Sequence, residues 1–378
     1  MKAVAVFPRE RDVRVIDTPE PRLAAPDQVK LRILEVGVCG TDREICGFHY
    51  GFPPEGSDHL VIGHECLGEV VDVGAQVKSF KKGDLAVLTV RRPCGKPDCP
   101  SCKEGRQDFC YTGAFKERGI KQQHGYMTEY VVDSEKFLLP IPKSLRDYAV
   151  LVEPLTIAEK ALIEVWQVQQ RLPWSCPHAG KSRPGVCHHA VVLGAGPIGL
   201  LGAMAFANAG FSTFVYSRED EKSDKADLVR SFGGTYISAQ VTPVDKLVER
   251  IGTIDVVYEA TGASKLSFEV LQHVGSNAAF LFTGVPGLKG PTEINTDQIM
   301  RNMVLKNQVL LGTVNAGRDA FEAAIKDLRD FKRKWPGALD RLITGRYHIS
   351  EAKTPLLSTD GIKNVIYFGK RNAPASLA

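Results

Sequence analysis

The strongest constraint on the fold is a short apolar run at residues 191–193 that leads directly into a glycine-rich turn and then an apolar helical stretch. In such a turn one glycine reverses the chain, the next lets backbone approach a pyrophosphate, and the last allows close packing of helix on strand. The N-terminus of the following helix presents free N–H groups to the phosphates. The segment therefore predicts a dinucleotide site formed by Gly194, Gly196, Pro197, Ile198 and Gly199.

Apolar strands and helices alternate after this turn, which predicts a parallel, doubly wound sheet. A domain of this class, the Rossmann dinucleotide-binding fold, is expected over residues 189–315. The segments that carry the alternation are Ala190–Leu193, Gly199–Ala209, Thr213–Tyr216, Asp255–Glu259, Ala278–Thr283 and Val309–Thr313.

The end of the second strand selects the dinucleotide. An acidic residue there would hold the ribose hydroxyls of NAD, but this chain has Tyr216, Ser217 and Arg218 before Glu219. A hydroxyl and a guanidinium suit a 2′-phosphate, because arginine makes charge-assisted bidentate bonds to phosphate. We expect Ser217 and Arg218 to favour NADP, with NAD still usable; a solvated loop charge is the alternative.

The remainder of the 378 residues suggests one further domain built from two segments. Residues 1–188 contain β-branched strands and turns, followed by an apolar helical pattern over residues 148–171 and a connector rich in Pro, Gly and Cys. Residues 316–378 combine an amphipathic helix with a short β-rich end, and we expect them to rejoin the first domain.

Charge and hydropathy exclude two classes of partner. Lys+Arg 48 against Asp+Glu 44 gives a net charge of +4 without a basic stripe, so nucleic acid is not expected. Residues 190–217 carry no charge, but glycines and a proline interrupt them, which favours strand, turn and helix over a membrane span. The N-terminus has no signal-peptide pattern, so we expect a cytoplasmic protein.

The chain has nine cysteines, an odd number that argues against a disulfide framework and for metal binding. Four of them lie close together in the loop 94–110, interleaved with glycine and proline. Four thiolates can complete a tetrahedral zinc and leave no open position, so this site should be structural. The expected ligands are Cys94, Cys99, Cys102 and Cys110.

A second set of metal-ligand types is scattered along the chain. Cys39, His64 and Glu153 could bind a catalytic zinc through one thiolate, one imidazole and one carboxylate. Each also has an ordinary explanation: a small core residue, a turn histidine, and a carboxylate favoured at a helix start. From composition alone both interpretations stay open.

Taken in order, the run Cys39-Gly-Thr-Asp42, the run Gly63-His-Glu65, the cysteine loop and the glycine-rich turn resemble the zinc-dependent medium-chain dehydrogenases/reductases. Arg91-Arg92, the run from Gly105 to Cys110, Glu153-Pro-Leu155 and the long connector resemble the glucose dehydrogenase branch. The resemblance covers nearly the whole chain. It implies a β-rich, GroES-like catalytic domain beside the Rossmann domain, and a dimer or tetramer.

The resemblance also implies residue roles. Cys39 and His64 would bind the catalytic zinc, Glu65 or Glu153 would supply a carboxylate or hold its water, and Thr41 would relay a proton. The remaining roles concern substrate and cofactor. Sugar hydroxyls would be bound by Thr41, Glu117, Glu153 and Asn315, and the cofactor also by Thr261, Thr283 and Asn315.

The chain departs from the family pattern in a few places. The spacing between Cys94 and Cys99 is longer than usual, and Val90 stands where some relatives carry an amide. Packing or surface roles are expected for Cys46, Cys66, His49, His124, His188 and His189, whereas Cys176 and Cys187 have no assigned role.

We therefore expect a zinc-dependent aldose 1-dehydrogenase that oxidises a sugar, D-glucose first, with NADP or NAD. One alternative is a polyol or secondary-alcohol dehydrogenase of the same superfamily. The other is a catalytically silent relative that binds NADP.

Overall fold

The computed structural model describes residues 1–174, 176–180, 183–287 and 290–369, and the chain forms two compact units. The first unit comprises Met1–Glu153, Asn315–Ile325 and Leu342–Ala378, and the second comprises Pro154–Val314 and Lys326–Arg341. The connector before residue 188 groups with the second unit because it bonds there: the Gly185 N–H donates to the Ala209 carbonyl at 2.9 Å.

The first unit is built from β-sheets. One sheet has the order β2-β1-β4, a seven-stranded sheet has the order β11-β6-β5-β3-β19-β18 with β10 paired to β3, and a small sheet has the order β7-β8-β9. The elements are β1 (Lys2–Phe7), β2 (Asp12–Asp17), β3 (Gln28–Gly37), α1 (Gly40–Cys46), β4 (Leu60–Val61), β5 (Glu65–Val73), β6 (Leu85–Leu88), β7 (Arg91–Arg92), α2 (Pro100–Lys103), β8 (Lys116–Arg118), β9 (Gln122–Gln123), β10 (Tyr130–Ser134), β11 (Leu138–Ile141), β18 (Ile343–His348), α11 (Lys353–Leu357) and β19 (Lys363–Tyr367).

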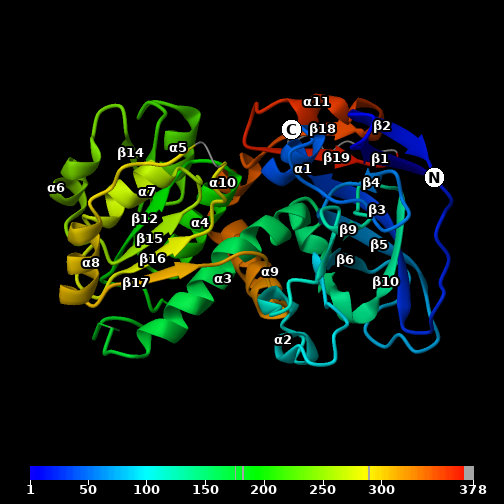
Figure 1. Cartoon of the computed structure of the whole chain (residues 1–378), viewed down its shortest axis with the longest axis horizontal. Coiled ribbons are helices and arrows are strands. Elements are labelled where there is room, and N and C mark those ends of the chain that lie inside the picture. Colours follow the sequence, from blue (N-terminus) through cyan, green and yellow to red (C-terminus); the bar gives the residue numbers. More distant parts are fainter. Residues whose placement is uncertain (175, 181–182, 288–289, 370–378) are drawn as a thin grey trace. The chain divides into compact units, whose positions relative to one another are not determined.

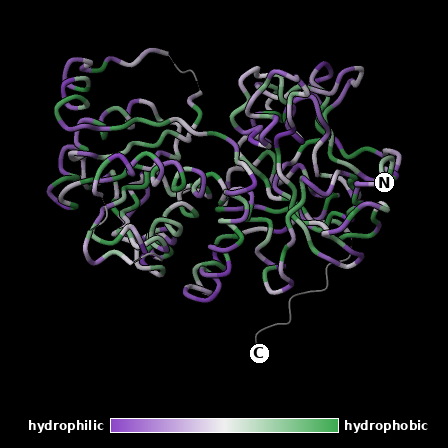
Figure 2. The backbone as a smooth tube through the Cα atoms, turned by 90° about the horizontal axis from the view of Figure 1, so that it is seen from below, coloured by the Kyte–Doolittle hydropathy of each residue, from purple (hydrophilic) through white to green (hydrophobic). Residues whose placement is uncertain are grey.

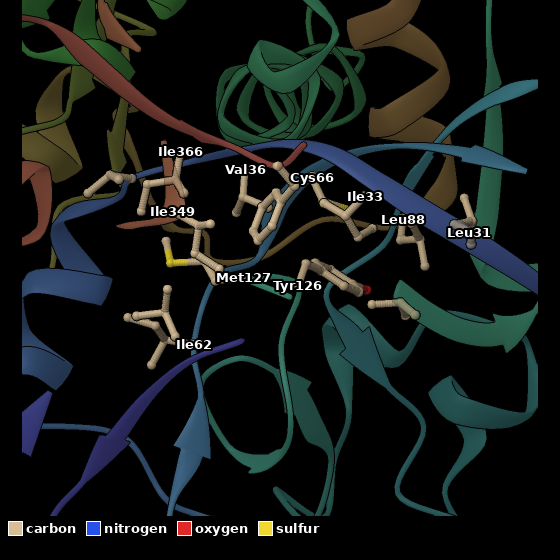
Figure 3. Close-up of a cluster of buried hydrophobic side chains, with 14 of the residues drawn as sticks. Leu31, Ile33, Val36, Ile62, Cys66, Leu88, Tyr126, Met127, Ile349 and Ile366 are labelled. Carbon is tan, nitrogen blue, oxygen red and sulfur yellow. The ribbon is translucent and has the colours of Figure 1, made fainter. Parts of the chain in front are cut away.

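Buried and more exposed residues alternate along β3, and this pattern explains how the strand is fixed in its sheet. Val29, Leu31 and Ile33 are fully buried, whereas the residues between them are half-buried or exposed. A strand with one buried face has a fixed register, because a slip by one residue would expose its apolar side chains. Figure 3 shows Leu31 and Ile33 in a core that also includes Tyr126 and Ile366 from other strands or turns.

The second unit contains one six-stranded parallel sheet with the order β14-β13-β12-β15-β16-β17. This is the strand order of a classic dinucleotide-binding fold. The elements are α3 (Val152–Gln169), which begins at the end of the first unit, β12 (His189–Leu193), α4 (Pro197–Asn208), β13 (Ser212–Ser217), α5 (Asp224–Ser231), β14 (Thr235–Ser238), α6 (Leu247–Ile251), β15 (Val256–Glu259), α7 (Ser264–Leu271), β16 (Ala279–Phe282), α8 (Thr296–Leu305), β17 (Val309–Gly312), α9 (Arg318–Lys334), whose residues up to Ile325 belong to the first unit, and α10 (Pro336–Asp340).

Burial on both faces accounts for the apolar strands of this sheet. In β12, Ala190–Leu193 are fully buried, as expected for a parallel strand covered by helices. Figure 1 shows the sheet in green and yellow among its helices, and Figure 2 shows green hydrophobic stretches alternating with purple hydrophilic ones along the chain. The mixed α/β class with a Rossmann sheet is thus confirmed.

The uncharged segment 190–217 resolves into β12, α4 and β13, which are three separately buried elements. Within the described part of the chain, no helix combines the length and apolar character that crossing a membrane requires. The apolar alternation does not predict strand β14, which has only four residues, or helices α5 to α8, which are short and whose apolar pattern is interrupted by charged residues.

Candidate functional site

The glycine-rich turn after β12 has the geometry of a phosphate-binding loop. Gly194 has a positive φ of 100°, and a Cβ there would lie 2.6 Å from Thr261. A Cβ on Gly199 would lie 2.1 Å from the Gly194 carbonyl, so this glycine is required for the helix to pack on the strand. A Cβ on Gly196 would meet nothing within 4 Å, which leaves its backbone open to a ligand. Pro197 begins α4, where a proline fits the first helical turn.

Thr261 and Thr283 follow the carboxyl ends of β15 and β16, the edge where doubly wound sheets bind ligands. Both are tied to Glu259, the last residue of β15. Thr261 donates its hydroxyl and backbone N–H to Glu259 Oε1 at 2.6 Å, and Thr283 donates its hydroxyl to the Glu259 carbonyl at 2.6 Å. Glu259 is buried and also receives the Gly262 N–H, so it organises this edge, a role that the sequence did not reveal.

The first acidic residue at the end of β13 is Glu219, and an ion pair already engages its carboxylate. Ser217 is half-buried and Arg218 is exposed. Glu219 Oε1 pairs with the Lys225 ammonium at 2.6 Å. A carboxylate already paired with a lysine is less available to a ribose hydroxyl, and the adjacent guanidinium is free to approach a phosphate.

The four cysteines of the loop 94–110 converge. Their sulfur atoms all lie within 4.8 Å of one another, and the Cys99 and Cys110 sulfurs are 3.9 Å apart. Tetrahedral zinc with Zn–S bonds of about 2.3 Å separates its sulfurs by about 3.8 Å. The four thiols therefore fit one structural zinc, and the longer spacing between Cys94 and Cys99 does not keep Cys94 out of the group.

Hydrogen bonds within this loop lower the pKa of two of its thiols, whereas burial raises the pKa of Cys102 to about 12. Backbone N–H groups, that of Cys102 foremost, lower the pKa of Cys99. Burial opposes the ionisation of Cys110, but bonds from Thr112 outweigh it and lower the pKa of this thiol to about 6. Since zinc binds the thiolate form, such a loop favours the metal.

The second cluster brings together residues that are distant in sequence. Cys39 directly precedes α1, while His64 and Glu65 lie at the start of β5. One donor atom from each of these three lies within 4.8 Å of the others, and His64 and Glu65 are buried. A thiolate, an imidazole and a carboxylate are the donor set of a catalytic zinc with an open position.

Asp42 supports this cluster and was missing from the predicted site. Its carboxylate is fully buried, accepts the Cys39 N–H at 2.9 Å and the Gly63 N–H at 3.2 Å, and lies 3.5 Å from His64 Nδ1. Although burial opposes protonation of His64, Asp42 raises its pKa. Among the described residues, none forms a hydrogen bond with the buried His64 Nδ1, and a carboxylate behind the ring, as Asp42 is, is the usual orienting group for a zinc-bound histidine.

Lys363 in β19 is a second supporting residue that the sequence did not reveal. It is fully buried, and its ammonium donates to both carboxylate oxygens of Glu65 at 2.8 and 2.6 Å and to the Val38 carbonyl at 3.2 Å. A Cβ on Gly37 would lie 2.0 Å from Glu65 Oε2, so only glycine leaves room for this carboxylate. Lys363 thus fixes Glu65 beside Cys39.

Glu153, at the start of α3, lies near the same cluster but outside the group of three. Burial and the nearby Glu65 raise its pKa to about 7, whereas His64 and Lys363 act in the opposite direction. A buried carboxylate with a pKa near neutrality can hold or exchange a proton at physiological pH. Thr41 is half-buried in the first turn of α1, two residues after Cys39.

The structure also brings Glu117 and Asn315 together. Both side chains are buried, and the Asn315 amide donates to Glu117 Oε1 at 3.2 Å. These residues are far apart in sequence, so only the fold reveals their contact.

The other cysteines divide between core and connector. Cys46 and Cys66 lie in the buried core of the first unit. Cys176 and Cys187 form a disulfide with a sequence separation of 11. The odd cysteine count argued against a disulfide framework, but one pair is bonded and the other seven cysteines are free thiols.

Comparison with known proteins covers nearly the whole chain. Residues 25–143 match the family described as alcohol dehydrogenase GroES-like domain, and residues 146–368 match glucose dehydrogenase C-terminus. Glucose 1-dehydrogenase of Methanocella arvoryzae is 39% identical over 94% of this chain and 96% of its own length. The glucose 1-dehydrogenase of Thermoproteus tenax is also 39% identical, over 91% of this chain and 92% of its own.

Solved structures agree in fold. Haloferax mediterranei glucose dehydrogenase in complex with NADP, Zn and gluconolactone has a TM-score of 0.87 at 32% identity, covering 98% of this chain and all of that one. Galactitol-1-phosphate dehydrogenase of Escherichia coli has a TM-score of 0.74 at 21% identity over 97% of this chain and all of its own, a likeness of fold alone.

Proposed function

The chain belongs to the glucose dehydrogenase branch of the zinc-dependent medium-chain dehydrogenases, and from this membership we propose that it oxidises an aldose, D-glucose first, at C1 to the aldonolactone with hydride transfer to NADP⁺. The observation that carries the proposal is the convergence of Cys39, which is half-buried, with the buried His64 and Glu65. It lies in a chain whose relatives named above, similar over more than nine-tenths of its length, are glucose 1-dehydrogenases.

Cys39, His64 and one carboxylate, Glu65 or Glu153, would hold the catalytic zinc, and Cys94, Cys99, Cys102 and Cys110 would hold the structural one. When bound, zinc supplies a Lewis acid for the C1 hydroxyl and NADP⁺ accepts the hydride. Asp42 orients His64, and Lys363 holds Glu65 in place. The chain's contribution is thus to fix the donors and to exclude water from them.

The proton of the C1 hydroxyl has two candidate carriers. Thr41 stands in the first turn of α1 beside the cluster and can pass a proton outward through its hydroxyl. Glu153, with a pKa near 7, can accept it. Glu117 and Asn315 would bind sugar hydroxyls, because a buried site built for hydroxyls rejects apolar alcohols strongly.

For the cofactor we propose a preference for NADP. The pyrophosphate would lie on the open backbone at Gly196 and the start of α4, and Arg218 with Ser217 would contact the 2′-phosphate. The supporting observation is that Glu219, the acidic residue after β13, pairs with Lys225. Asn315, Thr261 and Thr283 complete the proposed cofactor contacts.

We also propose that the enzyme is a cytoplasmic homo-oligomer. Strand β17 lies at the end of the sheet and pairs there with β16. Val304, Leu305 and Val314 beside it are 55–70% exposed. An apolar strand edge of this kind favours pairing with a second copy.

A substrate panel tests the activity. Purified, zinc-loaded enzyme is assayed for NADPH or NADH formation with aldoses, sugar alcohols and simple alcohols. We expect an aldose with NADP⁺ to give the highest kcat/KM and Arg218→Asp to shift preference toward NAD⁺. Faster oxidation of ethanol or benzyl alcohol than of glucose and galactose would overturn the proposal.

Two other results would identify the alternatives. Sorbitol or threitol as the best substrate would indicate a polyol dehydrogenase. Binding of NADP without reduction by any polyol would indicate a silent relative.

A further inference from the structure

We propose that Arg91 is a positioning residue for substrate recognition: it holds the Glu117 carboxylate by one oxygen and leaves the other for a hydroxyl of the sugar. This inference rests on the proposed function and deepens it, because it assigns a specificity role to a residue outside the metal cluster.

The geometry is specific to one atom. Arg91 in β7 lies opposite Glu117 in β8. Its Nε and Nη2 donate to Glu117 Oε1 at 3.0 and 2.9 Å, and the Asn315 amide donates to the same oxygen at 3.2 Å. In the part of the chain that the structure describes, no donor bonds Glu117 Oε2, and this oxygen is not sealed from solvent.

Arg91 itself is held rigidly. Its Nη1 donates to the Asp108 carbonyl at 2.9 Å, and its guanidinium lies 3.7 Å from the centre of the Phe115 ring. The side chain is only 7% exposed. A guanidinium fixed by stacking and by several bonds gives its partner a defined orientation, which a lysine cannot do with a single point charge.

The remaining oxygen of Glu117 suits a neutral hydroxyl donor. Arg91 and Glu117 cancel each other's charge, so the pair can stay buried, and a further anion gains no net attraction. An ionised carboxylate oxygen is acceptor-only, so its ligand must donate a proton, as an alcohol does. Two exposed aromatic rings lie near this pair, those of Tyr50 and Phe52, with centroids 6.1 Å apart. Their segment is held by the Phe52 N–H, which donates to the Ile120 carbonyl, and by the Phe52 carbonyl, which accepts the Gln122 N–H.

Arg92 provides a matched comparison in the same strand. It is equally buried and also pairs with a carboxylate, since its Nη2 lies 2.7 Å from Asp133. Arg118 binds the same Asp133 oxygen, and Tyr126 bonds Arg92. The Arg92 guanidinium donates to Thr89, the Arg91 carbonyl, Tyr126 and Asp133, and within the described residues it does not bond Glu117, so it represents a purely structural ion pair.

The test compares Arg91→Gln and Arg91→Lys with Arg92→Gln and Arg92→Lys. For the aldose that the wild type oxidises best, we expect Arg91→Gln to raise KM roughly 10- to 100-fold, the range for a hydrogen bond to a charged group. The change in kcat should stay below about threefold, because a contact equal in ground and transition states affects KM alone. Arg91→Lys should recover part of the loss, and KM for NADP⁺ should not change.

The controls make each outcome decisive. Arg92→Gln should lower the melting temperature without raising the sugar KM. Equal KM changes in the Arg91 and Arg92 variants would overturn the inference while leaving glucose oxidation intact. If the glutamine variants fail to fold, the two lysine variants give the same comparison. A wild type that oxidises no aldose would overturn both the proposed function and this inference.

Discussion

The two candidate metal sites are built in opposite ways. The four cysteines between residues 94 and 110 belong to one short loop, and local backbone bonds hold it in shape, such as that from Lys103 N–H to the Cys99 carbonyl at 3.2 Å. Cys39 and the adjacent pair His64 and Glu65 come from two separate segments, and Asp42 and the distant Lys363 hold them. A local site depends on its own spacing, whereas a scattered site depends on the surrounding sheet.

Breaking the scattered site should have the largest effect on catalysis. His64→Ala removes one of three donors, and we expect kcat/KM for the best substrate to fall by about 10³-fold or more, equivalent to about 4 kcal/mol of lost Lewis-acid stabilisation. Steady-state kinetics and zinc analysis measure this. Zinc should fall by one ion per chain while the melting temperature changes little; unchanged zinc would contradict the assignment.

Breaking the local site should mainly affect stability. Cys102→Ser should lower the free energy of unfolding by about 3 kcal/mol or more, because the structural metal contributes directly to folding. Thermal melting with zinc analysis measures the change, and Ser101→Ala in the same helix is the control. If the Cys102→Ser variant still contains two zinc ions per chain and has the melting temperature of the wild type, the four thiols are not a metal site.

The disulfide of the connector gives a second local test. Opening the Cys176–Cys187 loop by Cys187→Ser should cost about 2–3 kcal/mol of stability through loop-closure entropy. Zinc content and the sugar KM should not change. Thermal melting of the variant, beside the wild type with and without reductant, measures this, and identical melting curves would show that the bond does not stabilise the fold.

Loosening the scattered site through Lys363 should weaken the metal without removing a ligand. Lys363→Met should reduce zinc affinity by roughly 10- to 100-fold, the usual effect of a lost supporting group. Lys363→Arg, which keeps the charge, should retain more affinity. Chelator competition measures both variants, and an unchanged affinity in Lys363→Met would show that Glu65 needs no support.

A buried carboxyl pair of the second unit gives the smallest expected effect. Burial and the nearby Asp327 raise the pKa of Glu159 well above 4.5, and burial raises that of Asp327, whose Oδ2 accepts the Asn208 amide at 2.9 Å. In Figure 1 their helices, α3 and α9, lie side by side.

The pKa of Glu159 is higher in the folded than in the unfolded chain. The contribution of this pair to the free energy of unfolding is therefore fully present below about pH 4.5 and is lost as the pH rises through the pKa of the folded state. Glu159→Gln should therefore melt about 1–3 °C higher than the wild type at pH 9, an effect of less than about 1 kcal/mol. Melting curves from pH 5 to 9 test this, and parallel pH profiles of the two proteins would contradict it.

The features that depend on nearby residues could be predicted from the sequence. The glycine turn at 194–199 and the four cysteines of one loop could be predicted because their chemistry is complete within a short segment. The alternation of apolar segments after residue 190 likewise determined the parallel sheet, since buried strands and covering helices leave a local periodic signal.

The contacts between groups that are distant in sequence depend on how the whole chain folds. Arg91 holds Glu117 because β7 and β8 are paired antiparallel, and Lys363 reaches Glu65 because β19 and β5 both pair with β3. Asn315, which lies outside the strands, meets Glu117 through a segment that follows β17. None of these contacts has a local sequence signal, because a lysine or arginine is expected at the surface unless its buried partner is known. The long-range pairing of strands, not the spacing of residues, therefore sets the environment of the candidate catalytic residues.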